Sequence, residues 1–147
     1  MNAQPAVLYV HGGGWSAGDP SEGDEPWACP LLERHGYRAV SARYRLRTEA
    51  VYPAQLEDVQ AEVRTLKRDH EWVGVWGFSA GGHLAAFEHA LRMRAALEAV
   101  GAEVEFHALA GADHAWLPAP GMLRFGELAL DFFMRSHAAY VERRRRA

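Results

Sequence analysis

The feature that most constrains this 147-residue chain is the stretch WGFSAGG at residues 76–82. It follows an apolar run and opens a helical one, which places Ser79 on a sharp turn between a strand and a helix. This is the pattern of a nucleophile elbow, G-x-S-x-G. Gly77 and Gly81 fit that turn because a Cβ at either position would collide with neighbouring backbone. The N–H groups that open the helix point toward Ser79, where an oxyanion forms during acyl transfer.

A second strand-to-loop motif lies upstream, where the apolar run at residues 7–10 enters the sequence HGGGW at residues 11–15. The elbow pattern alone arises by chance in roughly one chain in twenty of this length, so the second motif adds independent weight. Consecutive glycines let the backbone approach a ligand and aim several N–H groups at one point, as a tetrahedral oxyanion requires. The two motifs together indicate acyl transfer.

Five segments, taken in order along the chain, resemble the α/β-hydrolase carboxylesterases. Within that family the sequence is nearest the hormone-sensitive-lipase-like and feruloyl/acetyl-esterase-like branches. The segments are HGGGW at 11–15, YRL at 44–46, YPAQLEDV at 52–59, GFSAGGHL at 77–84 and GADH at 111–114. The resemblance implies an α/β fold, a minimal three-layer sandwich in which a four-stranded, mostly parallel sheet carries helices on both faces. The implied strand order is second, first, third, fourth.

The chain departs from the family pattern after the elbow. Residues 82–100 can all be helical, but the apolar face shifts by roughly 130° near residues 88–90, at 100° per residue, as if two helices had been joined. The second half looks like the family's penultimate helix, which ordinarily follows two further strands and a cap region. Those strands and the cap region are therefore expected to be missing here.

The alternation of short apolar runs with amphipathic segments predicts strands and helices in a parallel sheet covered on both faces. Leu56, Val59, Val63 and Leu66 repeat at spacings of three and four, which predicts a sheet-covering helix with Pro53 in its first turn. Strands are expected at 7–10, 38–42, 72–76 and 104–109, and helices at 26–35, 53–70, 82–100 and 123–141.

Length and composition limit the class of protein. A chain with 49% hydrophobic residues fits a single domain over residues 1–147. No segment resembles a signal peptide or a bilayer-spanning run, so a cytoplasmic protein without membrane contact is expected. The arginine run at 143–146 is expected to be a solvated helix end. The rest of the chain has more acidic than basic residues, which argues against nucleic-acid binding. Cys29, the only cysteine, is expected to be a buried, inert thiol.

The resemblance also assigns the catalytic groups. Ser79 is the expected nucleophile, and His114 stands in the family's Gly-x-x-His position as the base that takes the serine proton. The expected oxyanion donors are the backbone N–H groups of Gly13, Gly14 and Ala80.

Other residues receive supporting roles or two open interpretations. Trp15 and Trp116 either line the acyl or alcohol pocket or belong to the core. His11 is expected to brace the oxyanion loop, and Arg45 with Asp58 is expected to form a structural pair. No histidine spacing predicts a metal site, and neither a metal nor an organic cofactor is expected.

The catalytic acid is expected to be absent, because the family's acid follows a strand that this chain lacks. Among the carboxylates between Ser79 and His114, Asp113 lies at the right end of the sheet. It is adjacent to His114, however, and neighbouring side chains usually diverge. The prediction is therefore a Ser79–His114 dyad with weak activity, in which Asp113 is the best substitute for the acid.

The predicted function is that of a serine carboxylesterase that hydrolyses short-chain acyl esters, its small-molecule substrates, through an acyl-enzyme. Two alternatives stay open, an amidase or formamidase with the same nucleophile, and a catalytically weak or dead hydrolase-derived binding module. A homodimer is expected because four strands leave two sheet edges and because the final helix adds exposed apolar side chains. Those side chains are Phe132, Phe133, Met134 and Tyr140.

Overall fold

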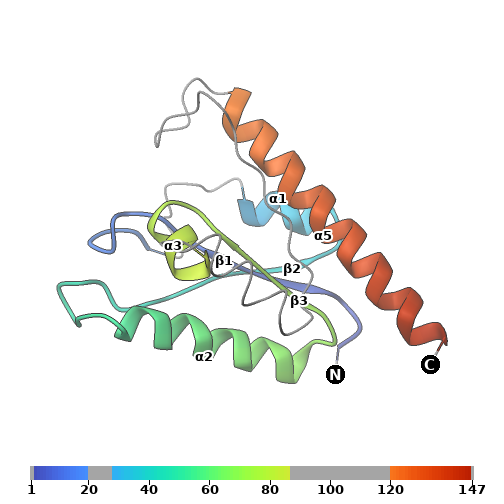
Figure 1. Cartoon of the computed structure of the whole chain (residues 1–147), viewed down its shortest axis with the longest axis horizontal. Coiled ribbons are helices and arrows are strands. Elements are labelled where there is room, and N and C mark those ends of the chain that lie inside the picture. The colour runs from blue at the N-terminus through green and yellow to red at the C-terminus, as the bar shows by residue number, and fades with distance from the viewer. Residues whose placement is uncertain (1, 20–27, 87–119, 147) are drawn as a thin grey trace. The chain divides into compact units, whose positions relative to one another are not determined.

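The computed structural model describes residues 2–19, 28–86 and 120–146, and the chain divides into two compact units, residues 1–88 and 89–147 (Figure 1). The first unit contains the sheet, and the second contains the long final helix. The described elements are β1 (Ala6–Val10), α1 (Ala28–Arg34), β2 (Arg38–Ser41), α2 (Ala54–Asp69), β3 (Val73–Gly77), α3 (Ala80–Ala86) and α5 (Pro120–Arg146). Within these described ranges, every helix is too short or too polar to cross a membrane.

The described strands form one parallel sheet with the order β2-β1-β3. Leu8 at the centre of β1 pairs with Val40 of β2 on one side and with Val75 of β3 on the other. This confirms the expected order of the first three strands. The expected fourth strand, residues 104–109, lies outside the described residues.

The central strand β1 is buried along its whole length because β2 and β3 flank it and helices pack on both faces of the sheet. Its alternate residues Ala6, Leu8 and Val10 belong to the main apolar cluster, which α2 and α3 complete with Val59, Leu66 and Leu84. In Figure 1 helix α2 lies along one side of the sheet, and α1 lies on the other. The first unit therefore has the helix–sheet–helix layering that the sequence predicts.

Helix α2 carries the apolar stripe expected of it. Val59 and Leu66 are buried, and Leu56 and Val63 pack half-buried against the same cluster. The expected start of this helix at Pro53 is wrong by one residue, since Pro53 has a ψ of 18° and stands at the N-cap position before Ala54. A proline suits that position because the first N–H groups of a helix have no intrahelical acceptor.

Other boundaries also differ from the sequence expectation. β3 extends to Gly77, and α3 begins at Ala80 rather than Gly82, because the chain turns directly from strand to helix around Ser79. α1 covers Ala28–Arg34 and ends one residue before the expected His35, and its expected start at residue 26 lies outside the described residues. Gly36 follows with a φ of 86°, a conformation that glycine adopts without strain after a helix end.

Helix α5 is longer than the expected span of 123–141, because its helical conformation continues through the arginine run to Arg146. The run is solvent-exposed, as expected of a solvated helix end, and Arg146 pairs with Glu142 one turn earlier at 2.8 Å. The expected exposure of Phe133 is wrong, since only 3% of this residue is accessible, whereas Met134 beside it is 51% exposed. The apolar residues of this helix therefore do not form one exposed surface.

Candidate active site

The elbow is a tight turn between β3 and α3. Ser79 has a φ of 50°, in the left-handed region that residues with a Cβ rarely adopt. The turn is closed by the N–H of Gly81, which donates to the carbonyl of Phe78 at 2.8 Å. The N–H of Phe78 donates to the carbonyl of Val10 at 3.1 Å, so the elbow is fixed to the end of the central strand. A left-handed serine costs about 1–2 kcal/mol, and this turn holds it in place.

The glycines on either side of Ser79 are required by close backbone contacts. A Cβ added at Gly77 would overlap the carbonyl of Gly81, and one added at Gly81 would overlap the carbonyls of Val10 and His11. Both collisions involve backbone atoms, which cannot move aside as a flexible side chain could. The expectation that these two positions must be glycine is therefore confirmed, with the colliding partners now identified.

The second glycine motif forms a loop directly after β1. Gly13, Gly14, Trp15 and Gly18 all have positive φ values, of 105°, 59°, 59° and 104°. The Gly13 carbonyl accepts hydrogen bonds from the N–H groups of Ser16 and Ala17 at 3.0 and 3.1 Å, which closes a turn. The loop is thus tightly wound, and glycine is the residue that adopts such conformations at little cost.

The loop and the elbow meet at Gly12. A Cβ at Gly12 would stand 3.2 Å from the Cβ of Ser79 and 3.2 Å from Cδ1 of Phe78, closer than most side-chain contacts. The two motifs are more than sixty positions apart in the sequence, and the structure brings them together at the carboxyl ends of neighbouring strands. This is the edge at which ligands bind in parallel α/β sheets.

His11 braces this loop, as expected. Its ring is buried, stacks on the ring of Tyr44 with centroids 4.4 Å apart, and places Nδ1 2.8 Å from the carbonyl oxygen of Gly12. The Tyr44 hydroxyl lies 2.9 Å from the carbonyl oxygen of His11 and 3.2 Å from that of Gly12. Burial raises the pKa of Tyr44 to about 12, so this hydroxyl keeps its proton at any pH near neutrality.

The three expected oxyanion donors lie in the glycine loop and at the first residue of α3. Among the residues that the structure describes, none accepts a hydrogen bond from the backbone N–H of Gly13, Gly14 or Ala80. Gly14 is exposed, and an added Cβ there would have no neighbour within 4 Å. N–H groups fixed in this way can donate to an oxygen atom that gains negative charge.

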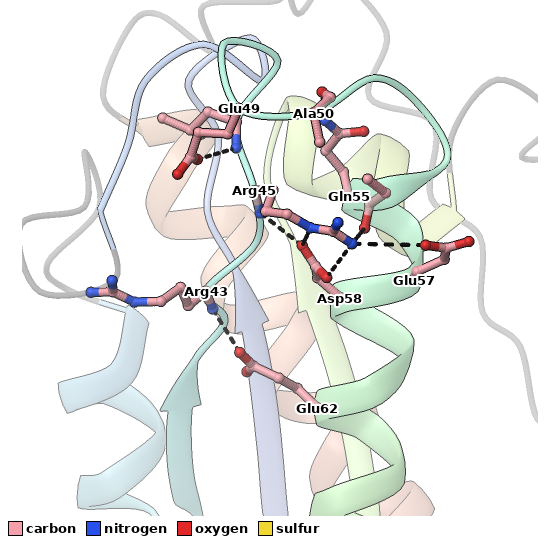
Figure 2. A network of polar contacts seen from close by, with 10 residues as sticks. Arg43, Arg45, Glu49, Ala50, Gln55, Glu57, Asp58 and Glu62 are labelled. Carbon is pink, nitrogen blue, oxygen red and sulfur yellow. Dashed lines mark hydrogen bonds and ion pairs between the residues drawn. The ribbon is translucent and has the colours of Figure 1, made fainter.

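A polar network supports the segment between β2 and α2 (Figure 2). The Arg45 guanidinium makes two hydrogen bonds of 2.8 Å to the Asp58 carboxylate, one to each oxygen, and the Arg45 backbone N–H adds a third at 2.9 Å. These hydrogen bonds lower the pKa of Asp58. Glu57 lies 3.7 Å from the same guanidinium, and the whole arrangement confirms Arg45 and Asp58 as a structural pair.

The same segment contacts the glycine loop. The backbone N–H of Arg47 donates to the Trp15 carbonyl at 2.7 Å, which joins the two loops. The Glu49 carboxylate accepts a hydrogen bond from the Leu46 N–H at 2.7 Å, and this local contact stabilises the turn that Figure 2 shows. Trp15 itself is half-buried and packs against the main apolar cluster, which favours the core interpretation of this residue.

Several expected site residues cannot be placed. His114, Asp113 and Trp116 lie outside the described residues, so their expected roles stay predictions. Cys29 is half-buried rather than buried, and burial together with the nearby charge of Glu33 raises the pKa of its thiol, which favours the inert thiol form. In the ranges that are described, no group of three or more His, Cys, Asp or Glu side chains could hold a metal ion.

No sequence pattern predicted a role for Tyr44 at this site. It stands in the YRL segment that carries the family resemblance, yet nothing in its spacing shows that its hydroxyl reaches residues 11 and 12. A sequence signal was present, since Tyr44 lies three residues beyond β2, the strand beside the one that leads into the glycine loop.

Comparisons with known proteins agree with the two motifs. The profile of the BD-FAE family matches residues 1–108. Arylacetamide deacetylase from Oryctolagus cuniculus is 38% identical over 90 residues, which cover 54% of this chain and 23% of that protein. Carboxylesterase NlhH from Mycobacterium tuberculosis is 38% identical over 93 residues, which cover 56% of this chain and 28% of that protein. The chain thus spans less than a third of the length of these curated relatives.

A solved structure shows the same fold. The crystal structure of ESTFA in its FE-lacking apo form aligns with a TM-score of 0.50 and 26% sequence identity, over 69% of this chain and 34% of that one. The alignment confirms an α/β fold with a small parallel sheet and helices, in agreement with a shortened α/β-hydrolase.

Proposed function

This chain belongs to the BD-FAE family, and from that premise we propose that it is a serine carboxylesterase acting on short-chain acyl esters through an acyl-enzyme. Relatives named as a carboxylesterase and a deacetylase support ester hydrolysis. The observation that carries the proposal is the left-handed backbone of Ser79, which lies on a strand-to-helix turn against Gly12 of the glycine loop. Backbone strain at a serine in such a turn is typical of a catalytic nucleophile and is not typical of a residue that only packs in the core.

In the proposed reaction the Ser79 Oγ attacks the ester carbonyl carbon while His114 accepts the serine proton. The carbonyl oxygen becomes an oxyanion, which the N–H groups of Gly13, Gly14 and Ala80 stabilise. Cleavage of the C–O bond releases the alcohol, which takes the proton back from His114 and leaves an acyl-Ser79 ester. Water, activated by His114, then releases the carboxylic acid and restores Ser79. No metal or organic cofactor enters these steps.

We propose that the catalytic pair works without a well-placed acid, with Asp113 as the best substitute. Glu49 is occupied by the hydrogen bond from the Leu46 N–H, which supports a structural role for it. Single amide replacements of Asp113, Glu49, Asp24 and Glu88 are expected to change kcat by less than about tenfold, or roughly 1.4 kcal/mol. A thousandfold loss in any one of them would identify an acid and overturn the dyad.

Hydrolysis of p-nitrophenyl acetate tests the proposal. Ser79→Ala should remove the activity, and His114→Ala should be nearly as damaging because nucleophile and base act as a unit. Ser41→Ala, which changes a serine of β2, serves as the matched control and should retain activity. Unchanged turnover in Ser79→Ala would refute the elbow assignment. His83 of α3 is the alternative base, and a greater loss in His83→Ala than in His114→Ala would refute the choice of His114.

Amide hydrolysis is the second candidate, because one relative is named an arylacetamide deacetylase. It would use the same nucleophile, with an amine in place of the alcohol as leaving group. Turnover of p-nitroacetanilide compared with p-nitrophenyl acetate separates the two activities. A kcat/KM that is higher for the anilide than for the ester would make the protein an amidase first.

A further inference from the structure

The Gly12 carbonyl is held by side chains from two different loops, one after β1 and one after β2. His11 Nδ1 lies 2.8 Å from this oxygen and the Tyr44 hydroxyl lies 3.2 Å from it. Because a carbonyl oxygen only accepts hydrogen bonds, Nδ1 must carry a proton to make this contact. The Tyr44 hydroxyl also lies 2.9 Å from the His11 carbonyl oxygen, so its one proton is shared between two successive carbonyls of the loop.

The direction of that carbonyl determines the direction of the next N–H. Among the described residues the cis peptide bond is Tyr52–Pro53, so the bond between Gly12 and Gly13 is trans. In a trans peptide the C=O and the following N–H point in opposite directions in one plane. Holding the Gly12 carbonyl toward His11 and Tyr44 therefore turns the Gly13 N–H to the other side of the backbone.

The next peptide is fixed in a similar way, but by local contacts. The Gly13 carbonyl accepts from the N–H groups of Ser16 and Ala17, which directs the Gly14 N–H. The Gly12 carbonyl, in contrast, has a partner outside the loop in addition to the adjacent His11 ring, because Tyr44 lies 32 positions away in the sequence. A flanking glycine offers little resistance to rotation of a peptide plane, so the Gly12–Gly13 peptide needs this external anchor.

Tyr44 is itself held firmly. It is 4% exposed, belongs to the main apolar cluster and stacks on His11 with an interplanar angle of 17°. The next residue, Arg45, is fixed to Asp58 through both its backbone N–H and its guanidinium (Figure 2). The hydroxyl thus reaches the loop from a rigid position, as a group that pre-organises a catalytic donor must.

We propose that Tyr44 is a positioning residue whose hydroxyl, together with the His11 ring, anchors the Gly12 carbonyl and so aims the Gly13 N–H at the oxyanion. The role in catalysis rests on the proposed esterase function, whereas the anchoring of the Gly12 carbonyl rests on the hydrogen bonds alone. Tyr44 does not touch the reacting atoms and acts only through the peptide that it holds.

The test is Tyr44→Phe, which keeps the stacked ring and deletes only the hydroxyl. Loss of an oxyanion donor costs about 10²–10³ in kcat, and a misdirected donor should cost less, about tenfold. We expect kcat for p-nitrophenyl acetate to fall by about this factor with KM changed by less than about twofold. The inhibition constant of a trifluoromethyl ketone, which mimics the tetrahedral intermediate, should rise by the same factor as kcat/KM falls.

Tyr9→Phe is the matched control. Tyr9 is 3% exposed, and no hydrogen-bond partner of its hydroxyl is found in the part of the chain that the structure describes. This variant should leave kcat, KM and inhibitor binding unchanged. A kcat for Tyr44→Phe within twofold of the wild type, or a loss matched by Tyr9→Phe, would overturn the proposal.

A readout without activity separates this inference from the proposed function. In a ¹⁵N NMR spectrum the amide signal of Gly13 should shift or broaden in Tyr44→Phe and stay in place in Tyr9→Phe. If the wild type hydrolyses no ester, the esterase proposal fails while this signal still tests the anchor. An unchanged Gly13 signal in a folded Tyr44→Phe variant would overturn the anchor even if Ser79-dependent hydrolysis is present.

Discussion

The strain at Ser79 predicts that removing its Cβ, and not only its hydroxyl, relieves the backbone and stabilises the fold. Ser79 has a φ of 50°, a value that costs a residue with a Cβ about 1–2 kcal/mol. Ser79→Ala and Ser79→Gly both delete the hydroxyl, but only glycine relieves the backbone. The glycine variant should therefore be the more stable of the two.

The size of the difference follows from two opposing terms. Relief of the left-handed conformation favours Ser79→Gly by about 1–2 kcal/mol. The greater freedom of glycine in the unfolded chain opposes it by about 0.4–1 kcal/mol. The net expectation is a free energy of unfolding about 1 kcal/mol higher for Ser79→Gly than for Ser79→Ala, or a Tm higher by about 4 °C.

Urea denaturation of the two variants measures this difference directly. Gly36→Ala is the reverse change, since it adds a Cβ to a residue with a positive φ, here 86°. The added Cβ would meet nothing within 4 Å, so backbone strain is its only expected effect. That variant should lose about 1 kcal/mol through backbone strain alone. Equal stabilities for Ser79→Gly and Ser79→Ala, alongside the expected loss in Gly36→Ala, would show that the elbow stores no strain.

Three further predictions concern packing, pH and assembly. Gly81→Ala should lower the free energy of unfolding by about 3 kcal/mol, because its Cβ would overlap the backbone carbonyls of Val10 and His11. Gly82→Ala, whose Cβ would stand 3.3 Å from its nearest neighbour, should change the free energy of unfolding by less than about 1 kcal/mol in urea denaturation. Arg45 lowers the pKa of Asp58 in the folded state. The ionised Asp58 carboxylate therefore stabilises the fold above its unfolded-state pKa of about 4, and this stabilisation is lost as the pH falls through the folded-state pKa. The stability difference between wild type and Asp58→Asn should thus shrink from pH 7 to pH 3, and equal differences would contradict the pairing. Light scattering at micromolar concentration should give the mass of a homodimer, a prediction that a monomer mass would refute.

The regular elements were predictable because their signals are local. The apolar run before the glycine loop predicts β1, and the stripe of Leu56, Val59, Val63 and Leu66 predicts α2. The order of the first three strands followed from the family resemblance and is confirmed. Boundaries differed where a backbone conformation decides them, as at Pro53, which precedes the helix instead of opening it.

The meeting of the two glycine motifs was predictable, but the contacts that hold the glycine loop in place were not. The two glycine motifs indicate a nucleophile and an oxyanion loop, and the structure places Ser79 against Gly12. The anchoring by Tyr44 could not be predicted because it depends on how a loop with four positive φ values folds back toward a neighbouring strand. The exposure of Phe133 was predicted wrongly because a helical face drawn from sequence does not show what covers it.

The most direct test of the account is covalent labelling with a fluorophosphonate, which reacts with an activated serine and leaves an unactivated one untouched. Peptide mapping of the labelled protein should find one adduct, on Ser79, and the Ser79→Ala variant should take up no label. A protein that stays unlabelled would contradict the account of Ser79 as an activated nucleophile. So would an adduct on one of the other serines, Ser16, Ser21, Ser41 or Ser136.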